Sequence, residues 1–117
     1  MATIESIIRN GKGTAHAWRV ERCESDPFIG TEYKLWHYST MMLHWLDRKE
    51  GSFVIAWQLG RGSVSDQNGM NTAFKVLELA YRYDRAGGAR IMHLACGKEW
   101  LWECQCRGTE NTQIWGW

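Results

Sequence analysis

Eight tryptophans and twelve glycines in a chain of 117 residues narrow the structures that this sequence can form. Indole rings carry a large apolar surface, so most of them are expected inside a compact aromatic core. Aromatic residues favour strands, and glycines favour the tight turns between strands. The sequence therefore predicts a sheet-rich protein, with any remaining tryptophans free to serve a binding surface.

Length and charge set the broad class. The chain is long enough for one domain, predicted to comprise residues 1–117 with a polar and aromatic tail at 108–117. Fourteen basic and thirteen acidic residues leave a formal net charge of +1. Such a balance does not favour nucleic acid or an anionic membrane as the partner. The sequence predicts a globular protein without a membrane partner.

The compartment is inferred from the N-terminus and the cysteines. Glu5 interrupts the first apolar stretch, so this stretch does not resemble a secretory signal. No run approaches the roughly 18 apolar residues of a membrane span. The four cysteines are then expected to be reduced thiols. These features predict a cytoplasmic protein.

Alternating and aromatic patterns predict the sheet. Strands are expected at 3–9 and 15–23, joined by the hairpin signal Asn10-Gly11-Lys12-Gly13. A long strand is expected at 32–46, followed by a return strand at 52–59 in which Phe53, Ile55, Trp57 and Leu59 share one face. A last hairpin is expected from 90–96 and 99–107 around Gly97-Lys98. Together these give about five or six antiparallel strands.

One helix is expected at residues 71–85. Its apolar stripe at three- and four-residue spacing comprises Met70, Ala73, Phe74, Leu77, Ala80 and Tyr81. Ser65, Asp66 or Asn68 is expected to cap it, and Gly87 and Gly88 to end it. The predicted class is therefore α+β, with an antiparallel sheet and this helix packed on one face.

The last predicted hairpin contains a candidate metal site, which its register allows us to examine. If Cys96 pairs with Glu99, then His93, Cys104 and Cys106 share a face, which is the donor chemistry that zinc prefers. In that register Cys96 points to the other face, and the paired C-x2-C spacing of strong zinc sites is missing. Buried free cysteines are the favoured interpretation, and no cofactor is expected.

The other chemistry-bearing residues do not predict an enzyme. His37 and His44 are separated by an odd number of residues, so one strand would place them on opposite faces. No serine or cysteine has a recognisable nucleophile spacing, and no spacing pairs two carboxylates. The protein is predicted not to be an enzyme.

The segment 60–71 is the richest loop. Three glycines, two serines and Arg61 precede the predicted helix, so loop amides and Arg61 could bind an anion. The segment matches neither the phosphate-binding loop nor the dinucleotide fingerprint. A capped connection is favoured, and an anionic-ligand site is the alternative.

Part of the chain resembles a known group of proteins. His37-Tyr38-Ser39-Thr40, a following strand, Gly62-Ser63-Val64-Ser65 and Asn71 ahead of a helix are similar to a pattern in small phage-encoded proteins. The resemblance covers residues 36–77, and the long C-terminal hairpin departs from it. It implies a viral protein that binds and blocks a host complex, such as a CRISPR effector or another defence machine.

Three functions follow from these observations. The favoured one is non-catalytic inhibition of a host protein complex by occlusion of its surface, through Trp36, Arg61, Trp115 and Trp117. The alternatives are nucleic-acid binding on an aromatic sheet face and anionic-ligand binding at 60–71. A homodimer paired through strand edges is also compatible with the pattern.

Overall fold

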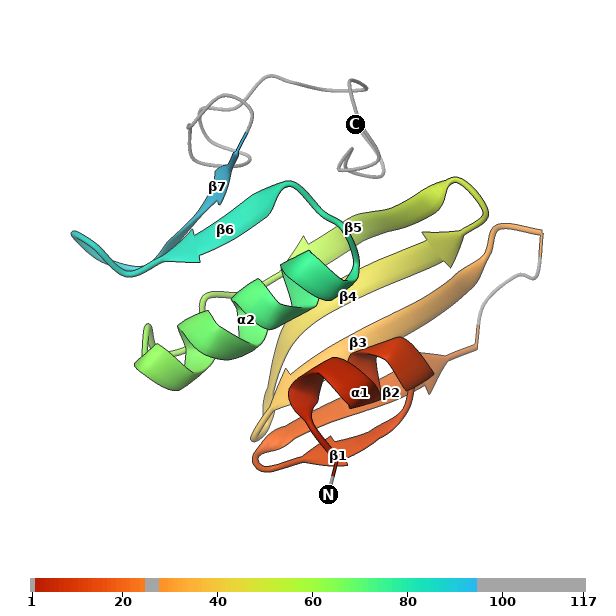
Figure 1. Ribbon diagram of the computed structural model, residues 1–117, viewed down its shortest axis with the longest axis horizontal. Helices are drawn as coiled ribbons and strands as arrows, with labels where there is room; N and C mark the ends of the chain where they lie inside the picture. The colour runs from red at the N-terminus through yellow and green to blue at the C-terminus, as the bar shows by residue number, and fades with distance from the viewer. Residues whose placement is uncertain (1, 25–27, 95–117) are drawn as a thin grey trace.

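The computed structural model describes residues 2–24 and 28–94 and has an α+β fold. The larger sheet has five antiparallel strands in the order β1-β2-β3-β4-β5 (Figure 1). These strands are β1 (Gly13–Ala15), β2 (Trp18–Cys23), β3 (Thr31–His37), β4 (Thr40–Arg48) and β5 (Gly51–Trp57). The predicted α+β class and the antiparallel sheet are confirmed.

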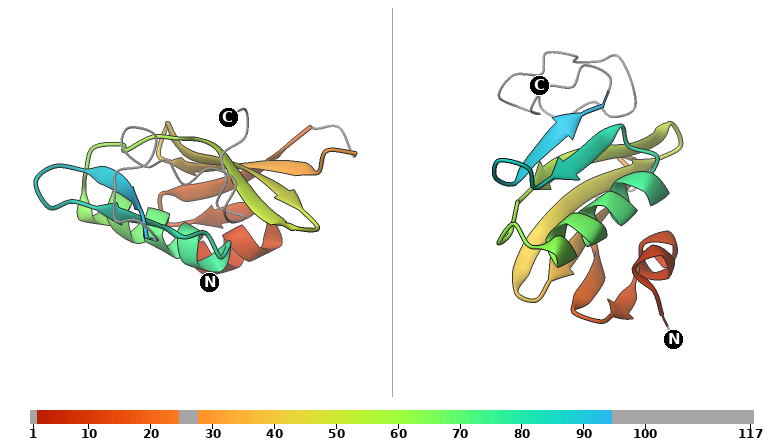
Figure 2. Two further views of the ribbon diagram at one scale, coloured as in Figure 1. Left: turned by 90° about the horizontal axis from the view of Figure 1, so that it is seen from above. Right: turned by 60° about the vertical axis from the view of Figure 1, so that its left-hand side comes forward.

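Two helices cover one face of this sheet. They are α1 (Ile4–Asn10) and α2 (Val64–Val76), and Figure 2 shows both below the sheet in its left view. A second antiparallel sheet of two strands, β6 (Tyr81–Asp84) and β7 (Arg90–His93), stands beside α2. The apolar side chains of the helices and of the covered sheet face form the core.

The first segment is a helix, so the prediction of a strand at 3–9 is wrong. Thr3 and Ser6 form a reciprocal capping box, and Gly11 ends the helix in the left-handed conformation at φ +70°. Ile4, Ile7 and Ile8 face the core at helical spacing. The glycine at position 11 therefore closes a helix instead of turning a hairpin, and the predicted strand 15–23 is divided between β1 and β2.

Residues 32–46 form two strands instead of the one long strand predicted. β3 ends at His37 and β4 begins at Thr40, and these two residues pair across a two-residue loop. Tyr38 adopts φ +55° in that loop. The turn was missed because Tyr38-Ser39 contains neither glycine nor proline and the flanking residues are all good strand formers.

The return strand β5 is where it was predicted, but its faces differ. A register shift opposite β4 leaves Ile55 as an extra residue. Val54 and Trp57 consequently pair with Trp45 and Leu43 on the covered face, while Phe53 pairs with Leu46 on the other. The predicted common face of 53, 55, 57 and 59 is therefore wrong.

The predicted helix 71–85 is displaced toward the N-terminus. Ser63 caps α2 with Asp66 as its reciprocal partner, so the helix begins inside the segment expected to be a loop. Residues 81–84 form β6, in which Tyr81 and Tyr83 are buried and Arg82 is exposed. Alternating apolar residues in this stretch fit the strand period as well as the helical one.

The Asn71 side chain on α2 forms hydrogen bonds with the backbone of β6. Its side-chain amide donates to the Tyr83 carbonyl, and the Tyr83 backbone N–H donates to its oxygen at 2.7 Å. On β7, Ile91 and His93 are both buried, as their predicted common face requires. The predicted partner strand 99–107 lies outside the described residues, as do Cys104 and Cys106.

Trp18 joins the sheet to α2. Its ring packs against Gly69, where an added Cβ would lie 2.0 Å from Trp18 Cζ2. The same indole stacks on the ring of His37 with centroids 4.1 Å apart. Glycine at position 69 therefore lets a tryptophan fit between helix and sheet, and this packing places His37 next to the start of α2.

Candidate functional site

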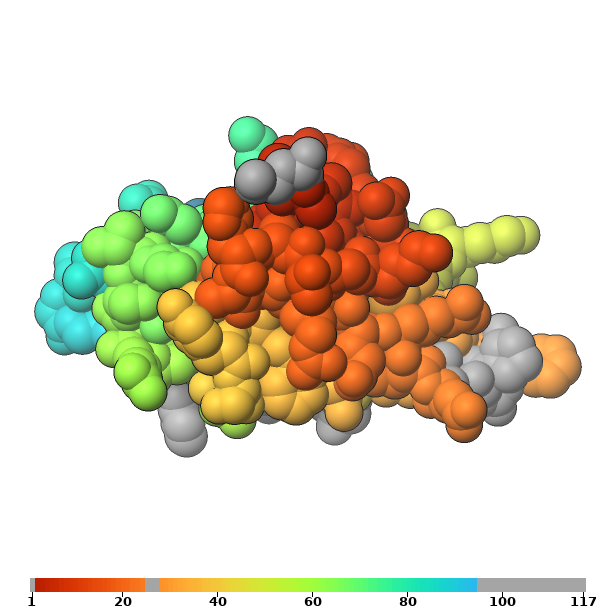
Figure 3. All heavy atoms as spheres, turned by 90° about the horizontal axis from the view of Figure 1, so that it is seen from below, coloured from red at the N-terminus to blue at the C-terminus, as the bar shows by residue number. Residues whose placement is uncertain are grey.

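A cavity of about 500 Å³ lies where the β3–β4 turn meets the start of α2. Its lining comes from residues 37–40 on one side and from 60, 61, 63, 65 and 66 on the other. Figure 3 shows the turn and the beginning of α2, which are far apart in the sequence, as neighbouring surfaces. Segments from two separate parts of the chain thus build one site.

His37 and Asp66 form the buried floor of this site. The Nδ1 atom of His37 lies 2.6 Å from Oδ1 of Asp66, and the two residues are only 6% and 3% exposed. Stacking on Trp18 fixes the plane of the imidazole ring. The pair is therefore held both by its own hydrogen bond and by the core.

The Asp66 carboxylate organises the loop around it. The backbone N–H groups of Arg61 and Ser63 both donate to Oδ2, at 2.9 and 3.1 Å. Burial raises the pKa of Asp66, but hydrogen bonds from Ser63, from the His37 ring and from the Arg61 backbone together lower it by more. The net pKa is lowered, so Asp66 is ionised at neutral pH.

Ser65 completes a chain of hydrogen bonds at the surface. Its Oγ lies 3.2 Å from Nε2 of His37, and Ser65 itself is exposed in the first turn of α2. An ionised carboxylate accepts hydrogen bonds only, so His37 donates from Nδ1 and, in its neutral form, accepts at Nε2. The Ser65 hydroxyl then donates to His37, which links a surface hydroxyl to a buried charge.

The rim of this cavity carries Tyr38 and Arg61. Tyr38 is 76% exposed and is held at positive φ, a conformation that costs a non-glycine residue about 1–2 kcal/mol. Tyr and Arg are, with Trp, the residue types enriched among those that contribute most binding energy at protein interfaces. The rim thus presents an aromatic ring and a cation beside the buried polar pair of His37 and Asp66.

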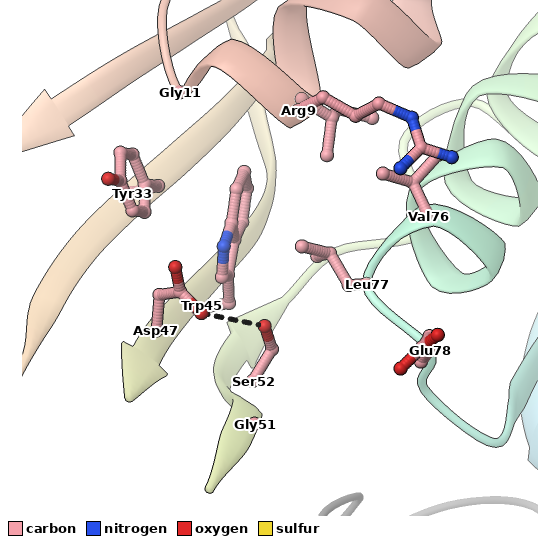
Figure 4. A pocket seen from close by; sticks show the side chains of 11 residues that line it. Arg9, Gly11, Tyr33, Trp45, Asp47, Gly51, Ser52, Val76, Leu77 and Glu78 are labelled. Atoms are coloured by element: carbon pink, nitrogen blue, oxygen red, sulfur yellow. Dashed lines mark hydrogen bonds between the residues drawn. The ribbon is translucent and has the colours of Figure 1, made fainter. Parts of the chain in front are cut away.

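A second cavity, of about 390 Å³, lies at the other end of α2. Figure 4 shows Tyr33 and Trp45 on one side and Leu77 and Glu78 on the other, with Arg9 above them. Tyr33 and Trp45 stack with ring centroids 5.4 Å apart. Among polar lining residues Ser52 donates to Asp47 at 3.3 Å, and Asp47 is exposed. This end is aromatic, with its charged groups on an exposed rim.

The residues predicted to bind a partner do not all meet. Arg61 lines the first cavity. Trp36 lies on the opposite face of β3 from His37, beneath Arg19, whose guanidinium carbon is 5.2 Å from the ring centroid. Trp115 and Trp117 lie outside the described residues. The structure therefore keeps Arg61 and Trp36 on different surfaces.

The metal candidates are placed only in part. His93 is buried, with its ring 5.5 Å from the ring of Tyr81. Within residues 2–24 and 28–94, no group of three or more His, Cys, Asp or Glu side chains is arranged to hold a metal ion. The predicted partners Cys104 and Cys106 fall outside these ranges, so the zinc hypothesis stays a prediction.

Sequence reasoning missed the cluster of His37, Ser65 and Asp66. Two of these residues are separated from the third by 28 or more positions, so no local spacing joins them. One signal was present, because Ser63-x-x-Asp66 is a capping-box pattern that places the start of a helix at this point. That pattern locates the helix start but not the histidine that meets it.

Comparisons with known proteins give one similarity. The chain is 27% identical over 109 residues to gelsolin of Xenopus laevis, an alignment covering 85% of this chain and 24% of that protein. The chain thus spans about a quarter of the length of this relative. No family model and no solved structure matches. In the part of the chain that the structure describes, no helix is both long and apolar enough to cross a membrane.

Proposed function

We propose that this protein is a binding protein that occupies a surface of a partner protein through the rim of the His37 cavity. The observation that carries the proposal is Tyr38, an exposed aromatic residue held at positive φ beside Arg61. Strained backbone persists where the surrounding structure imposes it, and such positions cluster at functional sites. A tyrosine has few side-chain torsions, so it loses little conformational entropy when a partner covers it.

The segment 36–77, which resembles small phage-encoded proteins, also supplies every residue that lines this cavity. This coincidence supports extending the proposal to a host protein complex, such as a CRISPR effector or another defence machine, as the partner. The action would be occlusion, in which the rim covers a surface that the complex needs. The protein would then serve as an inhibitor in the host cytoplasm.

Nucleic acid is a weaker second candidate. Arg19 does lie over Trp36 on the sheet face away from the helices, as that hypothesis requires. However, Glu21 pairs with Arg19, and Glu32 lies 2.8 Å from His44 on the same face. Acidic side chains among the basic ones weaken attraction to phosphates. We therefore favour a protein partner.

Site-specific photo-crosslinking tests the proposal. A photoreactive phenylalanine analogue replaces Tyr38 in one variant and Arg9, at the second cavity, in a matched control. In lysate of the natural host treated with nuclease, we expect one protein to crosslink from position 38 and not from position 9. A crosslink to a second copy of the chain would identify a homodimer instead.

Substitution gives the quantitative test. Arg61→Ala and Tyr38→Ala should each weaken capture of that protein by about 30-fold, corresponding to about 2 kcal/mol at a hot spot. Equal crosslinking from positions 38 and 9, or capture unchanged in the double variant, would contradict the proposal.

A further inference from the structure

We propose that Ser65 is a nucleophile, activated by His37 and Asp66, that accepts an acyl group from a carboxylic ester bound in the adjoining cavity. This activity goes beyond the binding function proposed above and rests on different atoms. It uses the hydrogen-bonded chain from Ser65 Oγ through the imidazole to Asp66, whereas partner capture uses Tyr38 and Arg61 on the rim.

The connectivity has the order that serine nucleophiles need. Oγ of Ser65 lies 3.2 Å from Nε2 of His37, and Nδ1 of the same ring lies 2.6 Å from Asp66. The carboxylate fixes the tautomer in which Nε2 carries a lone pair, and this lone pair is the base for the serine proton. Nucleophile, base and orienting acid are thus in contact in one chain.

The arrangement is fixed before any ligand binds. Arg61 and Ser63 hold the carboxylate through backbone N–H groups, and Trp18 holds the ring by stacking. Groups preorganised in this way need little rearrangement when charge develops. A hydrogen bond that served only to cap the helix would not require a histidine between Asp66 and a surface serine.

Access and charge also suit the reaction. Ser65 is exposed and lines the 500 Å³ cavity, so an ester carbonyl can reach its hydroxyl. Ser65 also lies in the first turn of α2, where N–H groups without intrahelical partners favour a negative charge. A tetrahedral oxyanion formed at Ser65 would develop at this positive end of the helix.

The reaction balances with water as the only second reactant. Ser65 Oγ forms a bond to the acyl carbon while its proton passes to His37 Nε2. The bond from the acyl carbon to the alcohol oxygen then breaks, and the departing oxygen takes the proton from Nε2. Water then attacks the acyl carbon of the acyl-serine while its proton passes to His37 Nε2. The bond from the acyl carbon to Ser65 Oγ breaks, and Oγ takes the proton from Nε2, so the products are a carboxylic acid, an alcohol and free Ser65.

An alkyl fluorophosphonate and p-nitrophenyl acetate are the probes for this activity. The full-length protein should gain one phosphonyl group per chain, located by peptide mapping at Ser65, and should release p-nitrophenolate. Ser65→Ala should lose both signals. Ser39→Ala should keep them, because Ser39 is also exposed at this cavity, while the described hydrogen bonds of His37 go to Asp66 and Ser65.

A second variant separates activation from mere exposure. His37→Gln should slow phosphonylation of Ser65 by at least about 100-fold, the usual contribution of a positioned base. Circular dichroism and thermal unfolding of Ser65→Ala, whose substitution is at the surface, confirm that loss of labelling is not loss of folding. Absence of labelling in the wild type, or equal labelling of the wild type and Ser65→Ala, would overturn the inference.

These outcomes are independent of partner capture. Ser65→Ala should still crosslink through position 38, because partner capture is assigned to Tyr38 and Arg61 on the rim. The purified wild-type protein should react with the fluorophosphonate in the absence of any partner. Failure of one proposal is therefore distinguishable from failure of the other.

Discussion

Each end of α2 borders a cavity, but the residues that line the two cavities differ in chemistry. At its start, a buried carboxylate, an imidazole and two backbone N–H groups form a closed hydrogen-bonded cluster. At its end, Leu77 and Glu78 face an aromatic wall of Tyr33 and Trp45, with exposed charges on the rim. Both cavities are open, but the carboxylate at the first is buried and accepts several hydrogen bonds, whereas the Asp47 carboxylate at the second is exposed and accepts one from Ser52. The two cavities are of similar volume, about 500 and 390 Å³, so it is the buried polar cluster that makes the first the candidate site.

A core substitution can disrupt the packing of Trp18 against Gly69, which holds the start of α2 against the sheet. In Gly69→Ala the added Cβ would lie 2.0 Å from Trp18 Cζ2, so the indole or the helix must move. We expect a loss of about 3 kcal/mol in the free energy of unfolding, measured by urea denaturation. Asn68→Ala, at an exposed neighbouring position, is the control and should change stability by less than about 0.5 kcal/mol. Similar values for both variants would show that Trp18 does not hold the helix here.

Removing one carboxylate charge at each end of α2 should reduce the free energy of unfolding by different amounts. Asp66→Asn replaces a carboxylate that accepts two backbone N–H groups and His37, and should cost about 2 kcal/mol. Asp47→Asn, at the second cavity, removes one exposed carboxylate bonded to Ser52 and should cost less than about 1 kcal/mol. Chemical denaturation of both variants gives the comparison, and equal costs would remove the distinction drawn between the two ends.

Acid should destabilise the cluster at the start of α2 by protonating Asp66. Because the folded-state pKa of Asp66 is below its ordinary value of 3.8, its stabilising contribution is present above that value. It is lost as pH falls from about 3.8 through the lower folded-state pKa. Thermal unfolding from pH 5 to pH 2 should show a shallower decline for Asp66→Asn than for the wild type. Parallel declines would mean that the hydrogen bonds do not favour the ionised carboxylate.

The smallest expected effect concerns backbone strain. Glu78 at the second cavity and Tyr38 at the first both have positive φ, at +56° and +55°. Glycine relieves this strain at some cost in unfolded-state entropy, so Glu78→Gly and Tyr38→Gly should each gain about 0.5 kcal/mol. If Tyr38 is a functional contact, its glycine variant should also lose partner crosslinking from a probe at position 39, which lines the same cavity, whereas Glu78→Gly should keep it. Loss in both variants would contradict the assignment of the rim.

Much of the fold could be predicted because it depends on local pattern. The strand at 52–59 was predicted within two residues at either end, and the α+β class followed from aromatic strands around one amphipathic helix. Two of the errors fell where one pattern fits two structures. Ile4, Ile7 and Ile8 fit a helix that was interpreted as a strand, and Tyr81 and Tyr83 fit a strand that was interpreted as a helix. In both places, caps and tertiary pairing decide between the two periods.

The candidate site was largely beyond sequence analysis. Arg61 was selected for its glycine- and serine-rich surroundings, and it does line the cavity. His37 was interpreted as one member of an unpaired set of histidines, because its partner lies 29 residues away on α2. Only the β3–β4 turn and the packing of Trp18 on Gly69 bring the two together. This contact has no local signature in the sequence. It depends on a turn without glycine and on a helix that starts seven residues earlier than predicted.

The state of the His37 ring is the most direct test of the ordered cluster at the start of α2. Long-range ¹H–¹⁵N correlation spectra of the ¹⁵N-labelled protein distinguish a protonated from an unprotonated Nδ1. In the wild type at pH 7, Nδ1 of His37 should carry the proton shared with Asp66. This signal should change in Asp66→Asn, while that of His44 should not. A neutral His37 protonated only at Nε2 would rule out the ordered cluster, because such a ring could neither donate to Asp66 nor accept the proton of Ser65.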